Sequence, residues 1–319
     1  MLSSLFPYRN GVSVSLGISL YGSDPRFLVP IARLADDLGF DSIWVGEHIV
    51  APEVMNAEHP YEGGWSKPAV VSADQRMYDL WTMIGAISAA TTNARIITGI
   101  SLLPLRHPII SARACITAQQ ISNGRFVFGV GAGWLGTEFE ALGVSFKDRG
   151  RRYDECLDIL DKLFRGGPVE HKGDFYSFPL LALINEAIQV PMVMGGTKGP
   201  AIRRAARRGD GWYGTTVPLE ETVRIRDEIE RLRREAGRDY LPFSYYNRIT
   251  GRPIAESLDR YRAEGFEDLV IPFEAIHPAI SADLSLDARL DSLTAVAKEI
   301  GLEPKEFGEV HPPSVRRSR

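Results

Sequence analysis

The chain has 319 residues, 44% hydrophobic and 24% charged, the composition of a globular protein that can bury a large core. Its formal net charge of −4 gives no overall attraction to a polyanion, so we expect no nucleic-acid partner. With two cysteines (Cys115 and Cys156), no signal-peptide pattern and no apolar run of ~18 residues, the sequence predicts a soluble, cytoplasmic protein with no membrane partner.

Strands and helices alternate from the N-terminus onward. A strand-like run at Val12–Leu20 precedes a helix at Pro25–Leu38, for which Asp24 supplies an N-cap. The next strand, Asp41–Gly46, is apolar at successive positions, as in a parallel strand buried on both faces. The segment Ile49–Ala73 is rich in Pro, Gly and Glu, and we interpret it as an insertion.

The same alternation continues to the C-terminus. The further predicted strands are Arg95–Leu103, Arg125–Val130, Val190–Met194, Gly211–Thr216, Phe243–Ile249 and Asp268–Phe273. The further predicted helices are Asp74–Ala90, Pro108–Ile121, Thr137–Leu142, Arg149–Phe164, Gly199–Arg208, Glu220–Glu235, Ile254–Glu264 and Leu286–Ile300. A second insertion, Gly166–Gln189, contains a predicted hairpin at Glu170–Phe178.

Eight strands in alternation with helical units predict an α/β fold, a (β/α)8 TIM barrel with insertions after strands two and four. An open doubly wound sheet is the alternative, because alternation by itself does not show closure. We predict a single domain over residues 1–310 and a disordered basic tail over residues 311–319.

Candidate active-site residues follow the strands, since the loops at that end of a barrel carry the chemistry. Glu47 and His48 come directly after the second strand. A histidine there can exchange a proton with a redox ring near neutral pH. The alternative is a hydrogen-bonded turn histidine.

Glycines cluster after the fourth strand, where Gly131, Gly133 and Gly136 form a G-x-G-x-x-G match. Three strand–helix units precede the match and only a short helix follows, which disfavours a dinucleotide-binding fold. Glycines there let the backbone approach a flat ring, or they serve tight strand packing.

A second glycine-rich segment, Met194–Pro200, joins the fifth strand to the N-terminus of a helix. Its small residues, exposed amides and Lys198 suit a phosphate group, and a turn without a ligand is the alternative.

Other chemistries are poorly represented. The six histidines form no H-x-H or H-E-x-x-H pair, so we predict no metal site. The sequence has no nucleophile-elbow or P-loop motif. Trp44 and Trp134 belong either to the core or to the wall of the site.

Four motifs, taken together and in order, resemble those of luciferase-like monooxygenases. They are Leu38–His48 (LGFDSIWVGEH), Thr98–Pro108 (TGISLLPLRHP), Ser122–Trp134 (SNGRFVFGVGAGW) and Pro191–Pro200 (PMVMGGTKGP) with Gly209–Trp212 (GDGW). The similarity is greatest to the branch of coenzyme F420-dependent oxidoreductases.

The resemblance implies a barrel, often a homodimer, that binds the deazaflavin F420 or FMN at its C-terminal mouth. It implies hydride transfer to or from a small organic substrate. The alternatives are an FMN-dependent two-component monooxygenase that uses O2 and receives reduced flavin from a partner reductase, and a flavin-binding barrel without turnover.

The resemblance also assigns roles to residues. Glu47 and His48 would face the reactive ring as catalytic groups, and Trp134 stands where sugar-phosphate dehydrogenase relatives have a catalytic glutamate. The implied cofactor contacts are Glu47 and His48, a ring-supporting bulge at Ile100, Ser101 and Leu102, the ring-lining Gly131 and Gly133, Thr137, and the phosphate-binding Gly195, Gly196 and Gly199.

The third strand is the least regular of the eight. It carries Thr98, Gly99 and Ser101 where a barrel stave is expected to be fully apolar. We therefore predict a bulge within Gly99–Leu102 that faces the glycines of the fourth strand, with a cis bond between Ile100 and Leu102. The alternative is a regular, all-trans strand.

Overall fold

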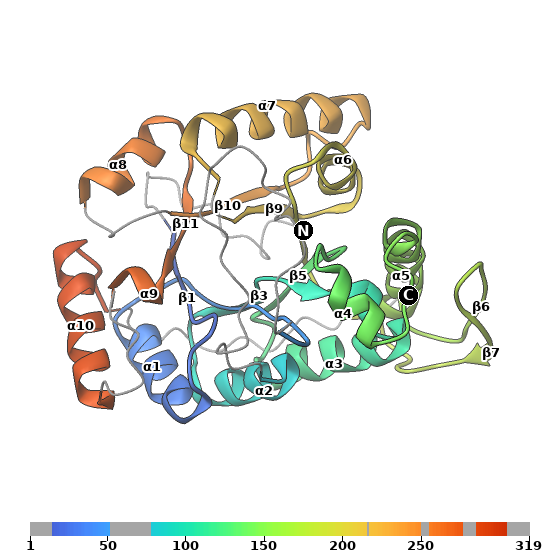
Figure 1. Cartoon of the computed structure of the whole chain (residues 1–319), viewed down its shortest axis with the longest axis horizontal. Coiled ribbons are helices and arrows are strands. Elements are labelled where there is room, and N and C mark those ends of the chain that lie inside the picture. Colours follow the sequence, from blue (N-terminus) through green and yellow to red (C-terminus); the bar gives the residue numbers. More distant parts are fainter. Residues whose placement is uncertain (1–14, 52–77, 216, 250–254, 277–284, 305–319) are drawn as a thin grey trace.

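The computed structural model describes residues 15–51, 78–215, 217–249, 255–276 and 285–304. Its main sheet is parallel, with the strand order β3-β2-β1-β11-β10-β9-β8-β5-β4 and a further pairing of β3 with β5. The strands are β1 (Ser15–Ser19), β2 (Ser42–Val45), β3 (Arg95–Thr98), β4 (Ser101–Leu102), β5 (Phe126–Gly131), β8 (Met192–Gly195), β9 (Gly211–Gly214), β10 (Ser244–Arg248) and β11 (Asp268–Pro272). Since β3 and β4 are halves of one stave, eight staves close a ring (Figure 1), which confirms the barrel over the open sheet.

Helices surround the ring on its outer side (Figure 1). They are α1 (Pro25–Asp37), α2 (Leu80–Ala90), α3 (Pro108–Ile121), α4 (Gly136–Ala141), α5 (Arg149–Phe164), α6 (Gly199–Arg208), α7 (Leu219–Glu235), α8 (Ala255–Ala263), α9 (Phe273–Ile276) and α10 (Leu286–Glu299). The predicted start of the second helix, Asp74, lies outside the described residues. Within the described part, α2 begins at Leu80, because Asp79 acts as N-cap and accepts a hydrogen bond from the Thr82 N–H at 2.8 Å.

The second insertion forms the predicted hairpin, in which β6 (Val169–Lys172) pairs antiparallel with β7 (Ser177–Leu181). The hairpin lies outside the ring of helices, beyond α5 (Figure 1). Glu155 of α5 anchors it by accepting the Tyr176 N–H at 2.8 Å and by contacting His171 Nε2 at 3.1 Å. Most of the first insertion, Ile49–Ala73, lies outside the described residues, as does the tail over 311–319. The single domain over 1–310 therefore stays a prediction.

Aromatic side chains fill the barrel interior. Trp44 stacks on Tyr213 with ring centroids 4.5 Å apart, and Tyr246 meets Trp44 edge-on at 4.9 Å. Gly17 accommodates the indole, since a Cβ at this position would lie 2.8 Å from Trp44 Nε1. Arg95 Nη1 donates to the Tyr246 hydroxyl at 2.7 Å, and burial raises the pKa of Tyr246 to about 12. The structure thus places Trp44 in the core.

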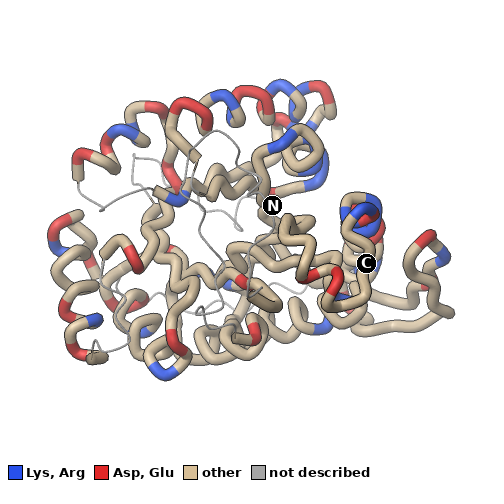
Figure 2. Tube along the Cα trace, in the orientation of Figure 1, with Lys and Arg blue, Asp and Glu red and all other residues tan. Residues whose placement is uncertain are grey.

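Charged residues are unevenly distributed over the outer helices (Figure 2). Acidic and basic residues alternate along α7, whereas α2 has no charged residue and α3 has only Arg113. No helix among the described residues combines the length and the apolar character that crossing a bilayer requires.

Candidate active site

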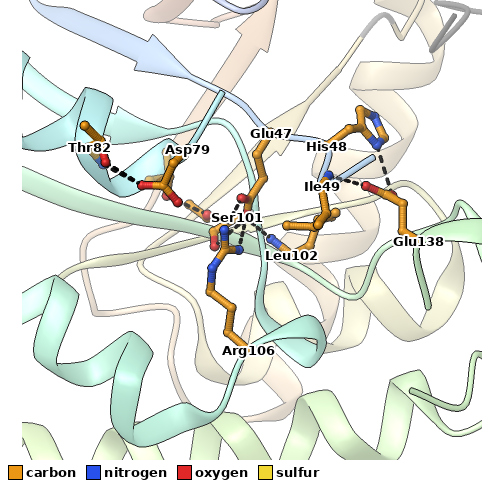
Figure 3. Close-up of polar contacts among 11 residues, drawn as sticks. Glu47, His48, Ile49, Asp79, Thr82, Ser101, Leu102, Arg106 and Glu138 are labelled. Carbon is orange, nitrogen blue, oxygen red and sulfur yellow. Dashed lines mark hydrogen bonds and ion pairs between the residues drawn. The ribbon is translucent and has the colours of Figure 1, made fainter. Parts of the chain in front are cut away.

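Glu47 follows β2, and only 1% of its side chain is exposed. Arg106 donates to both carboxylate oxygens, to Oε1 at 2.5 Å and to Oε2 at 2.6 Å. Oε1 also accepts the Ser101 hydroxyl at 3.0 Å and the Leu102 N–H at 2.9 Å (Figure 3). A buried carboxylate is stable only with such a complete set of donors. Glu47 therefore attaches β4 to the end of β2.

The third stave is interrupted between β3 and β4, where the peptide bond Gly99–Ile100 is cis. Before the break β3 pairs with both β2 and β5, and after it β4 pairs with β5. Ile97 lies opposite Val127 and Ser101 opposite Val130, so the third strand contains one extra residue between these two pairs. The predicted bulge within Gly99–Leu102 is confirmed, and the cis bond expected between Ile100 and Leu102 is wrong by one residue. Gly99 lies against Trp44, where a Cβ would stand 2.7 Å from Cε3, so this position favours glycine.

The side chain of Ile100 fills the space left by two glycines on neighbouring strands. A Cβ on Gly131 would lie 2.1 Å from Ile100 Cδ1, and one on Gly195 would lie 2.8 Å from the same atom. Both distances are too short for non-bonded carbon atoms. Close packing against the bulge is thus a sufficient reason for glycine at both positions. Ile100 is half-buried and packs on the aromatic and aliphatic side chains of the barrel interior.

His48 and Glu47 are neighbours in sequence but their side chains point to different partners (Figure 3). His48 Nδ1 lies 3.0 Å from Oε2 of Glu138, a residue of the first turn of α4 whose side chain is fully buried. The other oxygen of Glu138 accepts the Ile49 N–H at 2.5 Å. A carboxylate can only accept, so Nδ1 carries the proton in this contact.

Two aromatic rings flank His48. Trp134 meets its imidazole edge-on, with ring centroids 5.8 Å apart and an interplanar angle of 85°. Tyr21, which follows β1, meets it at 6.3 Å and 71°. Trp134 is therefore part of the wall beside His48, and the position that the resemblance aligns with a catalytic glutamate holds an indole.

The segment between β8 and α6 has the backbone that its glycines allow. Gly196 has a φ of 109°, in the left-handed region that favours glycine. Lys198 is the N-cap of α6, makes no capping hydrogen bond through its side chain, and is followed by Gly199 and Pro200. The positive end of the helix dipole lies at this turn.

Guanidinium groups gather between the N-termini of α5 and α6. Arg149 Nε donates to the Gly133 carbonyl at 3.2 Å, and Arg204 Nη2 donates to the Gly150 carbonyl at 3.1 Å. Burial, together with the nearby charge of Arg204, lowers the pKa of Arg149. Arg203 Nη1 lies 3.2 Å from the position of a Cβ on Gly199. Arg204 is paired with Asp154, its Nε lying 2.6 Å from Oδ1, so Arg203 is the guanidinium beside Gly199 whose charge suits an anion at the N-terminus of α6.

The structure brings most of the predicted site residues to one end of the barrel. Glu47, Ser101 and Leu102 share hydrogen bonds, and Ile100 packs against the glycines. Thr137 lies exposed on the first turn of α4, next to the buried Glu138. The assigned roles of all these residues toward a cofactor stay predictions.

Arg106 and Glu138 belong to the site but were not predicted from the sequence. Arg106 is the only Lys, Arg, Asp or Glu between Arg95 and Arg113, and a lone charge in an apolar loop signals a specific partner. Glu138 stands four residues after Trp134 and gave no comparable signal, because a glutamate in the first turn of a helix is ordinary.

Comparison with known proteins identifies relatives along most of the chain. The family model for luciferase-like monooxygenases matches residues 1–281. An uncharacterized protein of Mycobacterium tuberculosis is 31% identical over 263 residues, which cover 80% of this chain and 90% of that protein.

Two relatives with described activities match a smaller part of the chain. The F420-dependent glucose-6-phosphate dehydrogenase of Amycolatopsis mediterranei is 30% identical over 196 residues, 60% of this chain and 54% of that protein. The 4-hydroxyprotoasukamycin monooxygenase of Streptomyces nodosus is 29% identical over 206 residues, 62% and 48% of the two chains. Among solved structures, an F420-dependent secondary alcohol dehydrogenase in complex with an F420-acetone adduct shares the fold, with a TM-score of 0.71 and 18% identity over 90% of this chain and 99% of that one.

Arg106→Ala removes the bidentate partner of the buried Glu47 carboxylate. We expect the free energy of unfolding to fall by about 3–5 kcal/mol, the usual cost of an uncompensated buried charge. Denaturant unfolding measures this change, and Arg113→Ala, an exposed arginine on α3, is the control. Adding Glu47→Gln to Arg106→Ala should restore part of the loss. Equal stability of Arg106→Ala and the control would contradict the role given to this ion pair.

Gly131→Ala places a methyl group where Ile100 Cδ1 now lies, so we expect the bulge to move and the protein to lose about 1–3 kcal/mol of stability. Ile100→Val removes Cδ1, and the next contact of the new Cβ, with Ile100 Cγ1, is an ordinary 3.5 Å. The double variant should therefore be more stable than Gly131→Ala alone. Additive effects in a thermal-unfolding cycle would show that the two residues are not in contact.

Proposed function

The chain belongs to the luciferase-like monooxygenase family, and on that premise we propose that it is an oxidoreductase that transfers a hydride between a small organic substrate and the deazaflavin F420. The observation that carries the proposal is the His48–Glu138 pair at the end of β2, beside the bulge at Ile100. It places an imidazole with a defined protonated nitrogen where the loops of a barrel carry chemistry.

The residues at this end of the barrel fit a flat redox ring with an anionic tail. Ile100 gives the ring an apolar support, and the segment from Gly195 to Gly199 offers backbone amides at a helix N-terminus. Arg203 adds positive charge at that segment, and Arg149 adds it beside Gly133. When bound, the deazaflavin supplies the position that accepts or returns the hydride.

His48 would accept or donate the proton that is transferred together with the hydride. When a hydride leaves a carbon that bears a hydroxyl group, the hydroxyl proton must pass to a base as the carbonyl forms. Because Nδ1 donates to Glu138, a neutral His48 has its lone pair on Nε2. Proton transfer to Nε2 during oxidation, and from Nε2 during reduction, balances the reaction.

An FMN-dependent monooxygenation is the second candidate. The chain is 29% identical to 4-hydroxyprotoasukamycin monooxygenase and 30% identical to the F420-dependent relative, so sequence identity does not favour either activity. A flavin ring with a phosphate would use the same residues, and reduced flavin would come from a partner reductase. The homodimer, the cytoplasmic location and the reductase partner stay proposals of the same kind.

Binding of F420 and of FMN to the purified protein, followed by fluorescence titration, separates the two candidates. We expect F420 to bind more tightly, and a tighter complex with FMN would favour the monooxygenase. Gly199→Asp should raise the Kd for either cofactor at least about tenfold, or ~1.4 kcal/mol, because the carboxylate repels a phosphate while it stabilises the start of α6.

Gly199→Ser is the matched control for that variant, since it adds no charge at the same position. Gly196 is less suitable, because its φ of 109° and a Cβ position 2.8 Å from Ala201 Cβ would strain any substitution. An unchanged Kd for Gly199→Asp, with circular dichroism also unchanged, would remove the phosphate site from this segment.

His48→Ala should lower kcat by about 10²–10⁴ while the Kd of the cofactor changes little, because a positioned acid or base acts on the chemical step. Steady-state kinetics and the fluorescence titration give the two quantities on the same preparation. Parallel losses in kcat and in cofactor affinity would make His48 a binding contact only.

A further inference from the structure

We propose that Glu138 is the positioning residue of this site: its carboxylate holds His48 in the tautomer with the proton on Nδ1, so that Nε2 exchanges the proton with the substrate. The use of Nε2 in turnover rests on the proposed function. The tautomer itself is a property of the protein alone.

The two oxygens of Glu138 hold two consecutive residues. Oε2 contacts His48 Nδ1 at 3.0 Å, and Oε1 accepts the Ile49 N–H at 2.5 Å. The Glu138 side chain is fully buried and that of His48 is 12% exposed, so water competes little for either contact. The carboxylate cannot rotate without losing both partners. It therefore fixes the imidazole relative to the backbone that carries it.

The flanking rings leave this choice of nitrogen open. Trp134 and Tyr21 both meet His48 edge-on, and such contacts restrict the plane of the imidazole without distinguishing one ring nitrogen from the other. A carboxylate distinguishes them, because it accepts a hydrogen bond and cannot donate one. Glu138 thus determines which nitrogen of His48 carries the proton, and the two aromatic rings restrict the orientation of the imidazole plane.

A purely local role for Glu138 would look different. An acidic side chain in the first turn of a helix commonly serves the free N–H groups of that turn. The N-cap of α4, Leu135, has no side-chain capping bond. The oxygens of Glu138 nevertheless contact Ile49 and His48, which follow β2 and precede Glu138 by 89 and 90 residues in the sequence. The carboxylate is therefore directed at His48 and its neighbour, and α4 serves as its support.

The same arrangement of groups is known from hydrolases in which a buried carboxylate orients a catalytic histidine. There, replacing the carboxylate by an amide keeps the geometry but selects the wrong tautomer and lowers kcat by about 10⁴. Glu138→Gln makes the equivalent change here. The new amide can donate to Nδ1, which would move the proton to Nε2 and remove its lone pair.

Two-bond proton–nitrogen correlation spectra of the 15N-labelled full chain, without cofactor or substrate, read the tautomer directly. The His48 signals are assigned by their loss in His48→Asn. In the wild type we expect the proton on Nδ1, and in Glu138→Gln on Nε2. Glu140→Gln is the matched control, because Glu140 lies on the same helix and is exposed. It should leave the spectrum of His48 unchanged.

Kinetics then test the consequence. Glu138→Gln should lower kcat by about 10²–10⁴, with KM and the cofactor Kd altered less than about threefold, whereas Glu140→Gln should leave all three unchanged. A wild-type protein with the proton on Nε2 overturns the proposal, and so does a Glu138→Gln protein that keeps the proton on Nδ1. The wild-type spectrum tests the proposed tautomer of His48 even if Glu138→Gln does not fold. It also tests the tautomer if the wild type fails to turn over F420, a failure that would refute the proposed function alone.

Discussion

The buried carboxylate of Glu47 is the constraint on which this end of the barrel depends. It accepts four hydrogen bonds, from Ser101 and Leu102 of β4 and from Arg106, which lies between β4 and α3. Without them the short strand β4, only two residues long, would have little to hold it after the break at Gly99–Ile100. The charge is expensive to bury, so the donors must all be in place, and this requirement fixes where the chain resumes.

The position of β4 determines what lies around it. With Ser101 tied to Glu47, Ile100 is directed toward β5 and β8, whose glycines leave room for its side chain. Overpacking by a single methyl group would be costly in such a close-packed region. Glycine at positions 131 and 195 is therefore a consequence of the bulge, whatever the bulge supports.

The contacts of Glu47 also explain why the side chain of His48 can reach Glu138. Once the first side chain after β2 is committed to Arg106, the next one faces the opposite way, toward α4 and Glu138 (Figure 3). Glu47, whose partner is the guanidinium of Arg106, then stabilises the structure. Glu138, whose partner is the imidazole of His48, determines which nitrogen of that ring carries the proton. A barrel can separate these tasks because consecutive residues after a strand point to different neighbours.

The sequence by itself determined the eight-fold alternation, the hairpin and the irregular third strand, because periodicity, turn residues and a misplaced Gly and Ser are local signals. It also indicated the strand ends where His48 and the glycines lie. Only the tertiary structure decided that the ring closes, that Arg106 pairs with Glu47, and that Glu138 reaches His48 from 90 residues away. These contacts depend on which side chains meet once the staves are staggered around the barrel, and no local pattern encodes a distance between residues far apart in the chain.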